Sequence, residues 1–169
     1  MSRIKELLEE NQCSLAVAES LTGGLLSASI VEISGISKYY RGGATTYALK
    51  SKEDLLGVPL SHTQKSDAVD EYTAVSMAKG VTSLFHSDIG LATTGIAERW
   101  DEREEQAFVA LYDARNSKTA VHHLCFGEVI EQEKIQQEQI RPFVRNQVTQ
   151  FALKLLVDHL SGLNSFLKR

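Results

Sequence analysis

The sequence predicts an α/β fold, in which a mixed, mostly parallel sheet is covered by helices to give three α/β/α layers. Segments of strand character alternate with segments of helical periodicity along the first half of the chain, which is typical of a sheet with helices on both faces. Two further strand segments then follow each other around a short turn, which favours an antiparallel pair within the sheet. The length of 169 residues corresponds to roughly one domain, so we expect residues 1–169 to form a single one.

The elements of the first half are assigned from apolar spacing and from turn residues. Ile4, Leu7 and Leu8 keep helical spacing, and the apolar run after Ser14 is short enough for a buried strand. The expected elements are a helix over 2–12, a strand over 14–18, a helix over 22–31, a strand over 44–48 after Gly42 and Gly43, and a short helix capped by Ser51 and ended by Gly57.

The clearest helix of the chain is expected over residues 70–85. Its apolar residues step by four, three and four positions from Ala74 to Phe85, so one stripe faces a core. The polar run 128–139 fits either a solvated helix or an irregular excursion. The other expected elements are a strand over 89–93, an exposed charged loop over 98–105, paired strands over 107–112 and 119–126, and a long helix beyond Pro142.

Composition excludes several classes of protein. The net charge of −4 argues against the broad basic surface of a protein that binds nucleic acid or anionic lipid, so neither nucleic acid nor a membrane is expected as a partner. Cys13 and Cys125 lie far apart, which argues against a disulfide framework and fits a reducing cytoplasm. The N-terminus becomes polar at once, unlike a signal peptide, so we expect a cytoplasmic protein.

The strongest local signal is the turn 19–24 between a strand and a helix. Hydroxyl-rich and glycine-rich turns at a helix N-terminus present backbone N–H groups to an anion, either a phosphate or a developing oxyanion. A serine or threonine that merely caps the helix explains the same residues, and the pattern by itself favours that alternative. The usual dinucleotide and P-loop glycine patterns do not occur.

Lysine and arginine residues supply the other candidates. Lys52 follows Tyr47 by five positions, and a lysine that burial keeps neutral could take a proton from a serine. Arg141 and Arg145 are four apart and share a helix face, where they could bind a phosphate or a carboxylate. Solvated residues at a helix start explain Lys52, Arg141 and Arg145 as well, and the pattern by itself favours that alternative. The five histidines lack the spacing of metal ligands, so neither a metal nor a cofactor is expected.

Several short motifs occur together and in order. The run Ala18–Gly24 reads A-E-S-L-T-G-G and resembles the A-E-S-C-T-G-G signature of the CinA C-terminal domain, the nicotinamide-nucleotide amidase family. Further segments resemble the same family: Gly35-Ile36-Ser37, Gly42-Gly43-Ala44-Thr45-Thr46-Tyr47, Lys52, Leu56-Gly57-Val58, Met77-Ala78-Lys79-Gly80, Thr94-Gly95-Ile96-Ala97, and Arg141 with Arg145. The resemblance extends over nearly the whole chain.

The resemblance implies a function and roles for particular residues. It implies hydrolysis of the carboxamide of nicotinamide mononucleotide to the acid and ammonia, with a small nucleotide-like ligand, and it suggests a homo-oligomer. The nucleophile would be Ser20 and the general base Lys52, with Tyr47 nearby. The substrate-binding residues would be Thr22, Gly23 and Gly24 on the oxyanion or phosphate side, Thr94 and Gly95 on the opposite wall, and Arg141 and Arg145.

One segment departs from the family pattern. After Thr94-Gly95-Ile96-Ala97 the family has a glycine-rich loop, whereas this chain has the charged residues 98–105. Their five carboxylates against two arginines would repel a phosphate, which predicts weak binding of a mononucleotide. The alternative function is therefore a binding or regulatory protein on the same fold, with a decayed active site.

Overall fold

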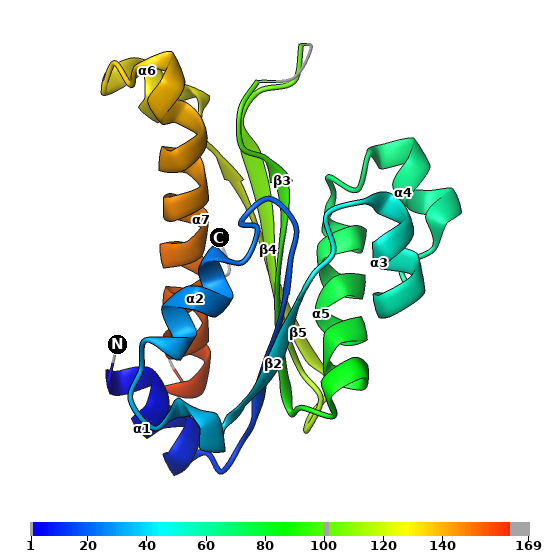
Figure 1. The fold of residues 1–169 in the computed structure, drawn as a ribbon, viewed down its shortest axis with the longest axis vertical. Coiled ribbons are helices and arrows are strands. Elements are labelled where there is room, and N and C mark those ends of the chain that lie inside the picture. Colours follow the sequence, from blue (N-terminus) through cyan, green and yellow to red (C-terminus); the bar gives the residue numbers. More distant parts are fainter. Residues whose placement is uncertain (1, 100–101, 163–169) are drawn as a thin grey trace.

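The computed structural model describes residues 2–99 and 102–162 and contains one five-stranded sheet (Figure 1). The strands are β1 (Leu15–Glu19), β2 (Tyr40–Thr45), β3 (Ile89–Ile96), β4 (Gln106–Asp113) and β5 (Lys118–Cys125). They lie in the order β2-β1-β3-β4-β5. β1 pairs in parallel with β2 and with β3, whereas β4 pairs antiparallel with β3 and with β5. The predicted mixed sheet is confirmed, since β4 alone opposes the other strands.

Helices cover both faces of this sheet (Figure 1). The helices are α1 (Ser2–Glu10), α2 (Leu25–Val31), the 3₁₀ helix η1 (Ile36–Lys38), α3 (Leu49–Leu56), α4 (Leu60–Ser66), α5 (Glu71–Phe85), α6 (Gly127–Gln132) and α7 (Gln137–Leu160). α1, α2 and α7 lie on one face, and α3, α4 and α5 lie on the other. This arrangement confirms the predicted three-layer α/β/α architecture.

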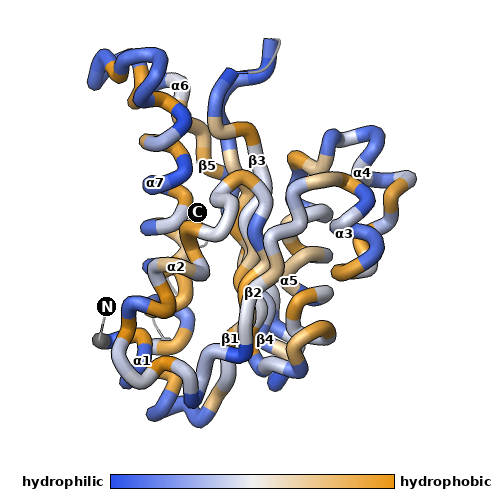
Figure 2. The backbone as a smooth tube through the Cα atoms, in the orientation of Figure 1, coloured by the Kyte–Doolittle hydropathy of each residue, from blue (hydrophilic) through white to orange (hydrophobic). Residues whose placement is uncertain are grey.

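The two faces of the sheet carry different side chains. Large apolar residues of the strands pack against α1, α2 and α7, whereas the face toward α5 is lined by small residues, among them Ala16, Ala18 and Ala92. A Cβ atom on Gly90 would lie 2.0 Å from the carbonyl oxygen of Ala78 in α5, so only glycine permits this approach. Figure 2 shows the hydrophobic residues concentrated on the strands and on the helix faces turned toward them. α5 is thereby fixed close to the strands whose ends form the site described below.

The second strand lies earlier than predicted, at Tyr40–Thr45 rather than 44–48. Gly42 and Gly43 resemble turn residues but belong to the strand. Glycine is needed at position 43 because α2 packs closely there: a Cβ on Gly43 would lie 2.5 Å from the Ser27 hydroxyl. The prediction that Ser51 caps the next helix is also wrong. The N-cap of α3 is Ala48, and the Ser51 hydroxyl donates to its carbonyl.

Three further differences concern the polar segments. The prediction missed α4, which is short and has no clear apolar period. The 128–139 run forms α6 and the beginning of α7, so the long terminal helix begins before Pro142. That proline removes a donor only from the carbonyl of Glu138, which is exposed to water.

The loop predicted over 98–105 is only partly exposed. The described part of this loop includes Glu105, which is buried. The carboxylate of Glu105 accepts a hydrogen bond from the backbone amide of Arg99, and its backbone carbonyl accepts one from the backbone amide of Phe126. Residues 100 and 101 of the predicted loop lie outside the described residues. Across residues 2–99 and 102–162, the helices lack the combination of length and apolar composition that crossing a membrane requires.

Candidate functional site

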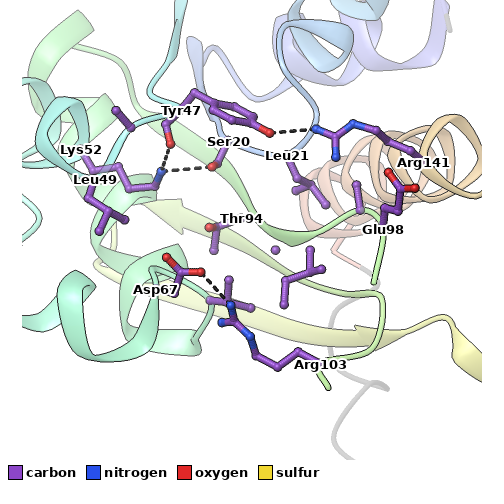
Figure 3. Close-up of a pocket in the computed structure, with 15 residues that line it drawn as sticks. Ser20, Leu21, Tyr47, Leu49, Lys52, Asp67, Thr94, Glu98, Arg103 and Arg141 are labelled. Carbon is purple, nitrogen blue, oxygen red and sulfur yellow. Dashed lines mark hydrogen bonds and ion pairs between the residues drawn. The ribbon is translucent and has the colours of Figure 1, made fainter. Parts of the chain in front are cut away.

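Six of the ten predicted site residues meet at the carboxyl ends of β1, β2 and β3 (Figure 3). Ser20 directly follows β1, Tyr47 follows β2 by two residues, and Thr94 and Gly95 lie at the end of β3. Together with Lys52 of α3 they line one pocket of about 320 Å³. Such crevices, at the carboxyl ends of neighbouring parallel strands, are where α/β proteins bind ligands.

Lys52 is a buried lysine that reaches the candidate nucleophile. The residue is 1% exposed, and its Nζ donates to the Oγ of Ser20 at 3.1 Å. The same nitrogen donates to the carbonyl oxygens of Thr46 at 2.7 Å and of Tyr47 at 3.1 Å. These three acceptors are neutral, and Lys52 has no ion-pair partner among the described carboxylates.

This environment changes the charge state of the amine. Burial lowers the pKa of Lys52 from its usual 10.5 to about 8, and the negative charge of Asp67 acts in the opposite direction. Desolvation disfavours the ammonium form because neutral carbonyl and hydroxyl groups replace water less well than a carboxylate would. A neutral amine therefore becomes accessible close to physiological pH.

The backbone around Ser20 is held firmly. Its amide donates to the carbonyl of Thr93 at 2.9 Å, which continues the pairing of β1 with β3, and its carbonyl accepts from the amide of Gly23 at 3.1 Å. On the facing wall the hydroxyl of Thr94 donates to the carbonyl of Ala68 at 2.6 Å. Nucleophile and facing wall are thus fixed by separate sets of hydrogen bonds.

Tyr47 participates through two different groups. Its carbonyl holds Lys52, whereas its phenol oxygen accepts from the Nη2 of Arg141 at 2.8 Å. The ring is exposed and extends across the mouth of the pocket toward α7 (Figure 3). Tyr47 and Arg141 therefore link β2 and α7 above the nucleophile.

The predicted anion site at the start of α2 is already filled by a side chain of the protein. Glu19 is fully buried, and its carboxylate accepts from the amides of Gly24, Leu26 and Ser27 at 2.8–3.0 Å. The Ser27 hydroxyl donates to it as well, at 2.6 Å. A carboxylate at this position neutralises the positive end of the helix, so these amides cannot hold a second anion.

The structure does not bring Thr22, Gly23, Gly24 and Arg145 into the pocket lining. The Thr22 hydroxyl pairs with that of Thr93 at 2.7 Å, and the guanidinium of Arg145 donates to the carbonyl of Thr22 at 2.7 Å. These residues stabilise the turn that carries Ser20, and they do so from outside the pocket lining. Arg141, one helical turn before Arg145, is the arginine of this pair that reaches the pocket.

Three charged pocket residues were missed by the sequence reasoning: Asp67, Glu98 and Arg103. Asp67 follows α4, which itself left no periodic signal. The segment 98–105 places Arg103 in the pocket, where its Nη2 lies 2.9 Å from the Oδ2 of Asp67. Glu98 is bound by Gln137 at 3.1 Å. The described residues contain no cluster of three or more potential metal ligands.

Comparison with known proteins shows the family of this chain. Residues 1–160 match the family of the CinA C-terminal domain. The chain belongs to this family. In this chain the residues A-E-S comprise Ala18 and Glu19 at the end of β1 and Ser20 directly after it, and Lys52 and Tyr47 line the pocket with Ser20.

Solved CinA structures share the fold. A competence-damaged protein (CinA) superfamily protein from Klebsiella pneumoniae aligns with a TM-score of 0.81 at 22% identity, covering 95% of each chain. The competence/damage inducible protein CihA from Agrobacterium tumefaciens aligns with a TM-score of 0.72 at 27% identity, covering 92% of this chain and 96% of that one.

The CinA-like protein of Syntrophus aciditrophicus is 43% identical over 129 residues, which cover 74% of this chain. The matched region is 31% of that protein, so this chain corresponds to less than a third of the length of its relative.

Among the described residues of this CinA domain, the substituted loop places one carboxylate in the pocket lining, that of Glu98. Its other described carboxylates lie outside the lining: Glu102 is exposed, Glu104 pairs with Arg99, and Glu105 is buried. The charged side chains of the lining are Lys52, Arg103, Arg141, Asp67 and Glu98. The expected repulsion of a phosphate therefore does not follow from the described residues.

Proposed function

We propose that this CinA domain hydrolyses a carboxamide, and that its substrate is nicotinamide mononucleotide or a close relative. The observation that carries the proposal is the 3.1 Å contact between Lys52 Nζ and Ser20 Oγ inside a pocket, with the lysine buried and free of a carboxylate partner. The family resemblance of the motifs supplies the substrate class.

The hydrogen bonds of Lys52 suit a general base. A neutral amine has two N–H bonds and one lone pair. The carbonyls of Thr46 and Tyr47 accept the two N–H bonds, which leaves the lone pair directed at the hydroxyl of Ser20. The same three partners accept all three protons of the ammonium form, so the amine can gain and lose a proton without reorganisation.

The chemical steps follow from this arrangement. The Oγ of Ser20 attacks the carboxamide carbon while its proton passes to Lys52. The tetrahedral intermediate then collapses, the C–N bond breaks, and Lys52 returns the proton to the nitrogen so that ammonia leaves. Water attacks the resulting ester and gives a proton to Lys52, which passes it to Ser20 Oγ as the C–O bond breaks. The products are one carboxylic acid and one ammonia for each amide and water consumed.

The oxyanion of the intermediate needs donors other than those of α2. Between residues 20 and 27 the amides of Leu21 and Thr22 are the ones without an acceptor among the described residues. Leu21 lines the pocket and directly follows the nucleophile. Its amide is therefore our choice for the oxyanion donor, in place of those of Gly23 and Gly24.

The proposal is tested by incubating the purified chain with nicotinamide mononucleotide and measuring ammonia and the acid product. The expected result is turnover that S20A abolishes. The uncharged riboside is the comparison substrate. Arg141 is the lining arginine without a carboxylate partner among the described residues, so the mononucleotide should have the lower KM. Absence of turnover on both substrates at high enzyme concentration would contradict the proposal.

A second function has one observation in its favour. The segment after β3 contains none of the family's loop glycines, and it places the side chains of Glu98 and Arg103 where the family has a glycine-rich loop. A binding or regulatory protein would use the same pocket without turnover. Equilibrium binding of the mononucleotide, measured by calorimetry and unchanged in S20A, combined with no ammonia release, would favour this function.

We also propose a homo-oligomer, as the family resemblance suggests. β2 and β5 are the two edge strands of the sheet, and each offers an outer edge at which the backbone of a second copy could pair. Light scattering at micromolar concentration should give a mass above 18.7 kDa, and a monomer alone would contradict this proposal.

A further inference from the structure

Asp67 is a carboxylate in the pocket wall. It ends α4 in the left-handed conformation with φ of 54°, and Ala68 follows with φ of 57°. The carbonyl of Ala68 accepts the short hydrogen bond from Thr94, so the backbone beside Asp67 is tied to β3. The backbone that carries Asp67 is therefore held beside β3, and its side chain lines the same pocket as Lys52.

Arg103 is the ion-pair partner of Asp67, at 2.9 Å. Their side chains are 38% and 59% exposed, respectively. Ion pairs this exposed contribute little to the stability of a fold, since water screens both charges. Stability is thus a poor explanation for an arginine that the substituted segment 98–105 places into the pocket. Figure 3 shows the guanidinium meeting the carboxylate on the pocket side.

We propose that Asp67 and Arg103 are positioning residues that set the charge of Lys52: Arg103 neutralises Asp67 and thereby keeps the Lys52 amine free of its proton. The catalytic meaning of this inference rests on the proposed function, whereas the charge of the amine is a property of the protein with or without turnover. The sign follows from electrostatics, because an unneutralised carboxylate favours the ammonium form of a nearby lysine.

Several charged side chains on the elements around Lys52 have hydrogen-bond or ion-pair partners other than Lys52. On α3 itself, Lys50 pairs with Glu53 and Asp54. The remaining groups belong to neighbouring elements: Glu19 of β1 binds the amides of α2, Asp70 before α5 pairs with His62 of α4, Glu98 after β3 binds Gln137 of α7, and Arg141 of α7 binds the Tyr47 phenol. Burial lowers the pKa of Lys52, and Asp67 is the charge that acts against burial and raises it.

Substitutions of the two members of the pair are therefore expected to shift the pKa of Lys52 in opposite directions. R103Q leaves the Asp67 charge unneutralised, so the pKa of Lys52 should rise. D67N removes the negative charge and leaves Arg103 positive, so the pKa of Lys52 should fall. A pair with a merely structural role would respond in the same way to either substitution, because both break the same contact.

The experiment is a pH titration of the lysine ε-carbons by NMR, with K52M used to assign the Lys52 signal. At low salt, R103Q should move the Lys52 midpoint up by about half a pH unit, and D67N should move it down by a similar amount. The double variant should lie between the two. R99Q is the matched control, because it breaks the exposed pair with Glu104 in the same loop and Arg99 does not line the pocket. It should leave the midpoint unchanged.

Midpoints that do not move, or that move in the same direction in R103Q and D67N, would overturn the inference. If the chain turns over its substrate, the acid limb of kcat/KM should follow the NMR midpoints in each variant. If it does not, the titrations still decide the inference. Failure of the proposed function and failure of the Asp67–Arg103 pair are therefore distinguishable.

Discussion

Two buried ionisable groups at opposite ends of the sheet show how differently one fold can treat a charge. Lys52 lies at the carboxyl ends of the parallel strands and is 1% exposed. Asp113 ends β4 beside the start of β3 and is fully buried. The lysine meets a hydroxyl and two carbonyls, whereas the aspartate meets a guanidinium and an imidazole.

The surroundings of Asp113 keep its charge. Arg115 donates to both carboxylate oxygens, at 2.9 and 2.7 Å, and His159 of α7 lies 2.9 Å from Oδ2. Burial by itself would raise the pKa of Asp113, but the hydrogen bonds from Arg115 and His159 outweigh it and hold that pKa at about 2. Arg115 also donates to the carbonyl of Asn11, so the cluster joins β4, α7 and the end of α1.

The comparison indicates that the partners of a buried group, rather than its burial, decide its role. A buried ionisable group with charged partners, such as Asp113, stays charged and holds elements together. A buried ionisable group with neutral partners, such as Lys52, has its pKa shifted so that the neutral form is favoured, and it becomes available for proton transfer at ordinary pH. We therefore expect substitutions at the two ends to separate activity from stability.

The largest expected effect is loss of the chemical rate on removal of the base. K52M, S20A and their double variant should each lose about a thousandfold or more in kcat, with the double variant no worse than either single one, since both groups act as one unit. K52R retains a positive charge but cannot accept a proton. It should be as inactive as K52M if the amine is a base. Turnover that survives in K52R would contradict the role of Lys52 as base.

At the other end, D113N should destabilise the fold and leave the Lys52 titration unchanged. The substitution removes the charge that Arg115 and His159 share, so the free energy of unfolding should fall by about 2–4 kcal/mol in urea denaturation. E10Q is the control, since it breaks an exposed pair with Arg3 and should change stability little. A stability of D113N equal to that of E10Q would refute the structural role of the cluster.

Glu19 is a buried carboxylate that holds the start of α2 and thereby positions the turn that carries Ser20. E19Q replaces one carboxylate oxygen by an NH₂ group, which cannot accept from the α2 amides. We expect a loss of about 1–3 kcal/mol in the free energy of unfolding and a fall in kcat of about tenfold. The acid limb of kcat/KM should stay in place, because Lys52 keeps its surroundings. A displaced limb would mean that Glu19 acts on the base itself.

The smallest effect is a pH dependence of stability. The pKa of Asp113 is lower in the folded chain, at about 2, than its usual value of 3.8. Its contribution is therefore present above pH 3.8 and is lost as the pH falls toward 2. D113N should lack this part of the acid destabilisation when unfolding is measured across that range. Parallel acid profiles for D113N and the unmodified chain would contradict the assignment.

Much of this arrangement can be predicted from sequence because it is local. The alternation of strand and helix predicts the layers, and the motifs around Ser20, Tyr47 and Lys52 identify these three residues of the pocket lining. The contacts of Glu19 could not be predicted in the same way, because a capping carboxylate and an anion-binding turn look alike in the sequence. Asp67 and Arg103 meet only through the tertiary fold, from segments without periodicity.

The central claim is that Lys52 is a buried base with a lowered pKa, and its own titration tests this most directly. In the NMR spectrum of the unmodified chain with labelled lysine ε-carbons, one signal should titrate near pH 8, and K52M should lack that signal. The account predicts this result without reference to any substrate. A Lys52 signal that titrates at or above 10.5, the ordinary value, would contradict it.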